Sequence, residues 1–191
     1  MPALAHSALG MIIKRYTPQI PLWAILLSVN LIDIIYFILF FSNIIEVYWS
    51  HGLFMVIVWS TIAMLITFSI AKYFNSRRNH NQKKRSTKII FKISVIIGFL
   101  VFSHWILDLI GWSMTGNGIP LLFNDSQKIK LEFLNFGEYN LLISAIVIEI
   151  GPFIIGLAIY IHYLIRQKKT KNKLLKESTL YSNQTEIESY L

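Results

Sequence analysis

A histidine and an aspartate stand four residues apart in the segment SHWILD, residues 103–108. In a helix, residues i and i+4 share one face, so the imidazole of His104 and the carboxylate of Asp108 would lie one turn apart. Such a pair can ligate one metal ion together, or the carboxylate can orient the imidazole from the second layer of contacts. The chain has no cysteine, which excludes thiolate metal sites. Mixed histidine and carboxylate ligands suit a divalent metal, zinc before manganese or iron.

Other ionisable side chains interrupt or border long apolar stretches of the chain: Asp33, Glu149, His51 and, near the N-terminus, His6. An ionisable group inside a bilayer costs on the order of a few kcal/mol, so each one marks a candidate functional site. Lys and Arg occur in these stretches only as Lys72 and Lys92, each near one end of its stretch. The acids must therefore be neutralised by protons, by the histidines or by a bound cation.

The depths of these residues predict one shared site. At ~1.5 Å of rise per residue, Asp33, His104 and Glu149 lie roughly 12 to 15 Å below the outer ends of their stretches. Three different helices would thus present a polar group near one level, and His6 could approach that level from the other side.

Structural roles compete with this interpretation. His104 beside Trp105 fits an aromatic pair at the membrane interface. Glu149 precedes Gly151 and Pro152, a kink at which freed backbone groups recruit polar side chains. Asp108 at a helix C-terminus would be a poor cap, because the helix dipole disfavours an acid there. The residues point to a site more strongly as a set than singly.

Four apolar segments are long enough to cross a bilayer, because ~20 apolar helical residues span a hydrocarbon core of ~30 Å. These spans are residues 20–41, 52–74, 89–112 and 140–165. The composition agrees, since 54% of the residues are hydrophobic, 14% are aromatic and only 15% are charged. The sequence therefore predicts an all-α fold, a polytopic membrane helix bundle with four transmembrane helices.

Residues 1–13 are also apolar, but as a helix they would reach only about 20 Å and could not cross. They lack a basic region, so they do not resemble a cleavable signal peptide. We expect a short N-terminal half-helix that enters the bilayer or lies in its interface. Residues 1–165 would form the membrane domain, and residues 166–191 a basic, polar tail that is loosely ordered from residue 171 onward.

The basic residues cluster at one side of the predicted spans. The net charge is +8, and of the 18 Lys and Arg only Lys128 and Lys130 lie outside residues 14–15, 72–92 and 166–176. The positive-inside rule then places both termini and the loop between spans two and three in the cytoplasm. This clustering indicates a multi-pass cell-membrane protein whose partners are the lipid bilayer and its anionic headgroups, and it disfavours nucleic-acid binding. The oligomeric state stays open.

Four short elements occur in an order that is similar to that of a known family: AHSALG at residues 5–10, LID at 31–33, WSHGL at 49–53 and SHWILD at 103–108. The pattern resembles the membrane-bound metal-dependent hydrolase family, whose members are described as LexA-binding inner-membrane hydrolases. It looks closest to a bacterial branch labelled permease or uncharacterised membrane protein, which implies the bacterial inner membrane. The resemblance covers most of residues 3–165 and implies a metal site with five ligands: His6, Asp33, His51, His104 and Asp108.

The chain also departs from the better-known members of that family. Those members carry a second aspartate after the first, and a His-Arg element ahead of the Ser-His. Here Asp33 is followed by Ile34 and Ile35, and residues 46–48 read EVY. Such a reduced set would hold one metal rather than two, or none.

The sequence alone is compatible with three different functions. In a metal-dependent hydrolase, a metal would activate water against a lipid-like or phosphoester substrate, with Glu149 or Asp108 accepting the proton. In a small permease or proton- or cation-coupled transporter, the same buried acids and histidines would carry protons or a cation. A non-enzymatic membrane interaction protein would use mainly its basic loop and tail. Ser50 and Ser103 adjoin histidines, but we expect them to bond backbone carbonyls rather than to act as nucleophiles.

Overall fold

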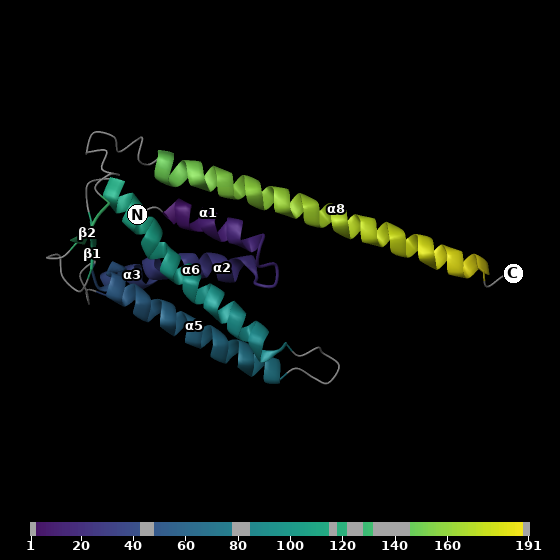
Figure 1. Ribbon diagram of the computed structural model, residues 1–191, viewed down its shortest axis with the longest axis horizontal. Coiled ribbons are helices and arrows are strands. Elements are labelled where there is room, and N and C mark those ends of the chain that lie inside the picture. Colours follow the sequence, from purple (N-terminus) through teal and green to yellow (C-terminus); the bar gives the residue numbers. More distant parts are fainter. Residues whose placement is uncertain are drawn as a thin grey trace.

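The computed structural model describes residues 3–42, 48–77, 85–114, 118–121, 128–131 and 146–188. Its helices run roughly lengthwise beside one another, with a short pair of strands at one end (Figure 1). In chain order the elements are α1 (Ala3–Lys14), α2 (Leu22–Val29), α3 (Leu31–Phe41), α4 (Tyr48–His51), α5 (Leu53–Ser76), α6 (Thr87–Met114), β1 (Ile119–Pro120), β2 (Lys128–Ile129), the π-helical turn η3 (Ile146–Ile150) and α8 (Gly151–Glu188). The fold is therefore mostly helical, as predicted.

Helices α5 and α6 form a hairpin whose length and apolarity indicate a membrane protein. At 24 and 28 residues, both are long and apolar enough to cross a bilayer. They approach closely at Gly98, where a Cβ atom would lie 3.1 Å from the carbonyl oxygen of Ser60. Helix α6 is the central element, since it also contacts α1, α2 and α3. Its most apolar stretch is 56% buried, against 17% for α5, so most of the apolar surface of α5 is exposed at the outside of the bundle.

The first predicted span, residues 20–41, is broken in the structure. Helix α2 ends at Val29, helix α3 begins at Leu31, and the two are bent by 56°. Asn30 lies at the break with φ −105° and ψ 5°, and its amide Nδ2 donates a hydrogen bond to the carbonyl oxygen of Leu26 at 2.8 Å. Asparagine favours such a break because its side chain competes with the backbone for local hydrogen bonds. Counted as one unit, α2 and α3 form a third candidate span.

The fourth predicted span, residues 140–165, is described only from Ile146 onward. There η3 leads into α8, whose apolar part ends at Ile165, before the basic run that Arg166 begins. Among the described residues, two helices, or three with the bent pair counted once, have the length and apolarity of a span. The structure thus supports two to three of the four predicted crossings, and the crossing by α8 stays a prediction.

Helix α8 also continues far into the predicted tail. Residues 171–188, which we expected to be loosely ordered, are helical to Glu188. The segment is rich in lysine, leucine and glutamate, which all have high helix propensity. Lys173 and Glu177 form an i,i+4 ion pair at 3.8 Å, and such pairs add a few tenths of a kcal/mol to an exposed helix, roughly 0.3–0.5.

Helix α1 is the predicted N-terminal half-helix, and it lies between α2 and α8 (Figure 1). Its small residues allow a close fit on both sides. A Cβ atom on Gly10 would lie 3.1 Å from Cδ2 of Leu26, and a Cβ atom on Gly156 of α8 would lie 2.8 Å from Cα of Ala8. Small residues serve in the same way wherever membrane helices pack closely. This packing buries His6 completely.

The strand pair was not predicted. Strands β1 and β2 are antiparallel, with Ile119 opposite Ile129 and Pro120 opposite Lys128. The backbone N–H of Leu131, just after β2, donates to the hydroxyl of Ser113 near the end of α6 at 2.8 Å. Ile119 joins the hydrophobic core, so the pair closes this end of the helical bundle.

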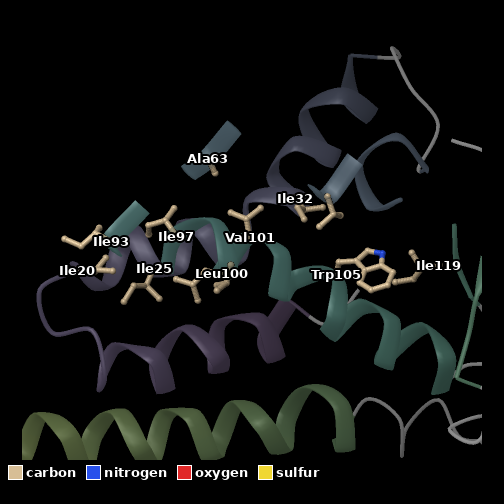
Figure 2. Packing of buried hydrophobic residues seen from close by; sticks show 12 residues of the cluster. Ile20, Ile25, Ile32, Ala63, Ile93, Ile97, Leu100, Val101, Trp105 and Ile119 are labelled. Atoms are coloured by element: carbon tan, nitrogen blue, oxygen red, sulfur yellow. The ribbon is translucent and has the colours of Figure 1, made fainter. Parts of the chain in front are cut away.

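The core lies along α6 and fixes the neighbouring helices to it. Figure 2 shows buried side chains of α6 packed against residues of α2 and α3, with Trp105 and Ile119 toward the strand pair. The α6 members of the cluster are Ile93, Ile97, Leu100, Val101 and Trp105. Because Ile25 and Ile32 are fully buried against them, α2 and α3 are held in a defined position relative to α6.

Candidate metal centre

Five histidine and aspartate side chains from four helices come together inside the bundle. Each is buried, with at most 7% of its surface exposed. Two overlapping groups have ligand atoms within 4.8 Å of one another: one contains His6, His104 and Asp108, and the other Asp33, His51 and His104. The structure thus brings together all five residues at which the sequence resemblance implies metal ligands. Their role as ligands stays a prediction.

Asp108 on α6 lies among all three histidines. Its Oδ1 is 3.6 Å from Nε2 of His6 on α1. Its Oδ2 is 3.5 Å from Nε2 of His51 on α4 and 3.2 Å from Nε2 of His104, one turn earlier on α6. The i,i+4 spacing that the sequence displayed therefore does place both α6 side chains on one face.

Asp33 on α3 adds a second carboxylate to the arrangement. Its Oδ1 is 3.3 Å from Nε2 of His51 and 3.6 Å from Nε2 of His104. Asp33 is in the first turn of α3, directly after the break at Asn30. The bend of the first span therefore sets the direction in which this carboxylate enters the site.

His104 is oriented by the same break. Its Nδ1 lies 2.7 Å from the carbonyl oxygen of Val29, the last residue of α2, so Nδ1 carries the proton and donates it. Carbonyls in the last turn of a helix lack intrahelical partners, and this one is satisfied by the imidazole. In the neutral ring the lone pair then resides on Nε2, which faces Asp108 and Asp33. A backbone carbonyl behind a histidine is a common support of metal-ligating histidines.

His51 is oriented by its neighbour in the chain. Its Nδ1 lies 2.7 Å from the hydroxyl of Ser50, while its Nε2 faces Asp33 and Asp108. The ring of Tyr36 meets the His51 ring edge-on, with centroids 5.5 Å apart. Ser50 thus contacts an imidazole, and Ser103 bonds the Leu100 carbonyl at 2.7 Å, as we expected of Ser103.

The chain Ser50, His51, Asp33 has the residue types of a nucleophilic triad, but its geometry favours a supporting role. The Ser50 side chain is buried, and its hydroxyl is bonded to the Nδ1 of the adjacent residue. An attacking hydroxyl must reach a substrate carbonyl at about 3 Å. The buried position of Ser50 instead suits the orientation of the His51 ring.

His6 packs face to face on His104, with ring centroids 3.8 Å apart and an angle of 6° between the planes. Its Nε2 is 3.2 Å from the backbone carbonyl oxygen of His104 and 3.6 Å from Asp108. Its Nδ1 has no hydrogen-bond partner among the described residues. The half-helix therefore does carry its histidine into the site.

The site is rich in acceptors and poor in donors. Both carboxylate oxygens of Asp108 and Nε2 of His104 are buried, and within the part of the chain that the structure describes they have no hydrogen-bond partner. The ion-pair contacts of Asp33 and Asp108 in these residues are with histidines, not with lysine or arginine. Two carboxylates with neutral histidines carry a charge of −2, and burying it unpaired would cost several kcal/mol per ion. Such a cluster calls for a divalent cation or for protons.

Glu149 is placed apart from these contacts. It lies in η3, is partly exposed, and belongs to neither ligand group. π-Helical turns occur frequently at functional sites, and η3 contacts α1, the helix that carries His6. The catalytic role that we predicted for Glu149 stays a prediction.

Two features of the site were not visible in the sequence. The Val29 carbonyl that orients His104 depends on the break between α2 and α3, for which Asn30 within an apolar run was the available signal. The contact of Ser50 with His51 depends on the short helix α4.

A comparison of this chain with family models, with curated proteins and with solved structures finds no match. The resemblance to the metal-dependent hydrolase family therefore stays a prediction, and the geometry of the site is the basis for function.

Proposed function

We propose that the chain is an integral-membrane, metal-dependent hydrolase that holds one divalent ion, zinc, and acts on a lipid-like or phosphoester substrate. One observation is the main support for a bound metal ion: the separations among the candidate ligand atoms. Ligands about 2.0 to 2.1 Å from a tetrahedral zinc lie roughly 3.3 to 3.4 Å from one another. Four separations among Nε2 of His51, Nε2 of His104, Asp33 Oδ1 and Asp108 Oδ2 are 3.2, 3.3, 3.5 and 3.6 Å.

The charge of the cluster supports the same proposal. Two carboxylates balance one divalent cation, and the unpaired acceptors of His104 and Asp108 are the atoms that a cation would satisfy. The absence of cysteine favours zinc held by nitrogen and oxygen. Asp33, His51, His104 and Asp108 would hold the ion, with His6 closing the site over His104 and Asp108 Oδ1.

The hydrolytic part of the proposal depends on the chemistry that such a site supports. Because the four proposed ligands fill a tetrahedral shell, a zinc ion there would need a fifth position for water or substrate, where it would supply polarisation of a phosphoryl or carbonyl oxygen and activation of water. Asp108 would help to hold the ion through Oδ2 and would accept a proton at Oδ1, the oxygen that faces His6. Burial of the site within the helices favours a substrate that reaches it from the lipid phase.

Hydrolysis is tested with purified protein supplied with zinc and a panel of lipid phosphomonoesters and phosphodiesters, with phosphate or alcohol release as the readout. We expect release that depends on zinc and falls by two orders of magnitude or more in Asp108→Asn, the typical effect of losing a general base. His162→Ala, which changes an exposed histidine on α8, should retain full activity. Lack of release from every ester by zinc-loaded protein would contradict the hydrolase.

A transporter is the second candidate, favoured by the broken helix pair. Discontinuous membrane helices form the ion and substrate sites of many transporters, and here the break at Asn30 adjoins Asp33 and the carbonyl that bonds His104. The two candidates differ in their response to pH. Metal ligands must be deprotonated, so metal affinity falls as the pH drops through the histidine range near 6.5. A proton-coupled site would instead bind little zinc and would drive pH-dependent uptake in vesicles, which Asp33→Asn would abolish.

A further inference from the structure

A second site lies at the other end of the bundle, away from the metal centre. We propose that the groove between α2 and α5 binds one anionic phospholipid, with an acyl chain on α6 and the phosphate at Arg85. This inference is independent of the hydrolase proposal, because the groove shares no residue with the metal centre.

The groove exists because two helices pack on a third without filling the space between them. Helices α2 and α5 both contact α6, and the groove between them has a volume of about 410 Å³. Its floor is formed by Ile93 and Ile97 of α6, which are buried. Its walls are largely apolar residues of the two flanking helices: Trp23, Ala24 and Leu27 on α2, and Ile70 and Ala71 on α5. A volume of this size is typical of a small-molecule pocket.

One end of the groove is basic and fixed. Arg85 lines it two residues before α6 begins. The backbone N–H of Arg85 donates to Oδ1 of Asn75 at 2.7 Å, and Nδ2 of Asn75 donates to the Arg85 carbonyl at 2.9 Å. These two bonds attach Arg85 to the end of α5 and hold it at the mouth of the groove. Its guanidinium can bind a phosphate through two parallel hydrogen bonds.

The chemistry of the lining selects a lipid over a soluble anion. No acidic residue lines the groove, so Arg85 has no competing carboxylate there. A free phosphate would leave the apolar walls uncovered, whereas an acyl chain covers them. Trp23 is 69% exposed at the start of α2, beside the basic end of the groove. Exposed tryptophans at helix ends are typical of the headgroup level of a membrane, which is where a phospholipid would present its phosphate.

The occupant is tested by native mass spectrometry of the purified full chain, with phosphatidylglycerol or phosphatidylcholine added as the probe. We expect one phosphatidylglycerol to be retained in preference to phosphatidylcholine. Arg85→Gln should lower its retention by about tenfold, the usual effect of losing a charge-assisted bond. The control is Arg77→Gln, which removes the same charge from an exposed arginine at the end of α5, outside the groove lining, and should leave retention unchanged.

A second variant separates the groove from general attraction to charge. Ala71→Phe places a large side chain in the groove, keeps the net charge, and should reduce the retention of phosphatidylglycerol at least as much as Arg85→Gln does. Equal losses in Arg85→Gln and Arg77→Gln would overturn the proposal and indicate diffuse binding to basic residues. Equal retention of the two lipids by the wild-type chain, or full retention by Ala71→Phe, would overturn it as well.

Discussion

The imidazoles of the metal centre are oriented by groups behind them as much as by the carboxylates in front. His104 donates from Nδ1 to the Val29 carbonyl, and His51 contacts the Ser50 hydroxyl through its own Nδ1. In both rings Nε2 is left to face Asp33 and Asp108. A ligand set held in this way is preorganised, which lowers the entropy that a metal ion must offset when it binds.

Ser50→Ala tests this support. The variant removes the hydroxyl behind His51 while every proposed ligand stays in place, so zinc affinity should fall by about 10- to 100-fold, the usual effect of losing such a contact. The matched control is Ser103→Ala, because the Ser103 hydroxyl bonds a backbone carbonyl within α6 and contacts no ligand ring in the described structure. Competition with a zinc-binding dye measures both affinities. Equal affinities in the two variants would refute the orienting role of Ser50.

At the scale of residues, the sequence was a good guide to the site because buried ionisable groups are costly and therefore conspicuous in apolar segments. His104 and Asp108 could be assigned to one helix face from their spacing alone. The resemblance added His6, Asp33 and His51, and the structure brings all five together. The backbone partner of His104 could not be predicted, because it depends on where α2 ends.

Among the helices, α1 has the most specific task, because it carries His6 into the site from a position between α2 and α8. Its distance from α8 is set at Gly156, where an added Cβ would approach Ala8 to 2.8–2.9 Å. Contacts of that length involve the backbone of α1, so a larger side chain at residue 156 must push the whole half-helix away.

Gly156→Leu should therefore destabilise the protein by roughly 1–3 kcal/mol, the usual cost of overpacking. It should also weaken zinc binding, because it displaces His6 without changing any proposed ligand. The control is Ala158→Leu, which introduces the same side chain at an exposed position of the same helix. Thermal unfolding in detergent and zinc titration of the two variants provide the comparison. A Gly156→Leu protein with wild-type stability would show that the close contact of α1 with α8 is not required.

The element boundaries show where sequence patterns stop being informative. Apolar length predicted α5 and α6 within a few residues, because a membrane span has a strict length requirement. The same criterion joined α2 and α3 into one span, since the apolar run continues through Asn30. Composition made the tail look disordered, but lysine, leucine and glutamate allow the helix of α8 to continue.

For the whole molecule, the charge distribution predicts how the chain is oriented across the membrane. Contacts within the structure do not determine this orientation. The basic ends of α5 and α6 and the C-terminal half of α8 lie toward the same end of the bundle, opposite the strand pair (Figure 1). Cysteine accessibility in intact cells and in inverted vesicles should place Lys84 and Lys171 in the cytoplasm and Asn124 outside. Lys84 and Asn124 lie outside the described residues, and the sequence predicts that both lie between spans, where single cysteines can be probed. Labelling of both from the same side would contradict the four-span topology.

The central claim is that the buried cluster binds a metal ion, and the metal content of the purified protein tests it most directly. Protein prepared without chelator and analysed by inductively coupled plasma mass spectrometry should carry close to one zinc per chain. His104→Ala should lose most of it, because Nε2 of His104 lies 3.2 Å from Asp108 and 3.6 Å from Asp33 at the middle of the cluster. His162→Ala should keep it. A wild-type chain that binds no metal, even when zinc is supplied at neutral pH, would contradict the metal centre and favour the transporter.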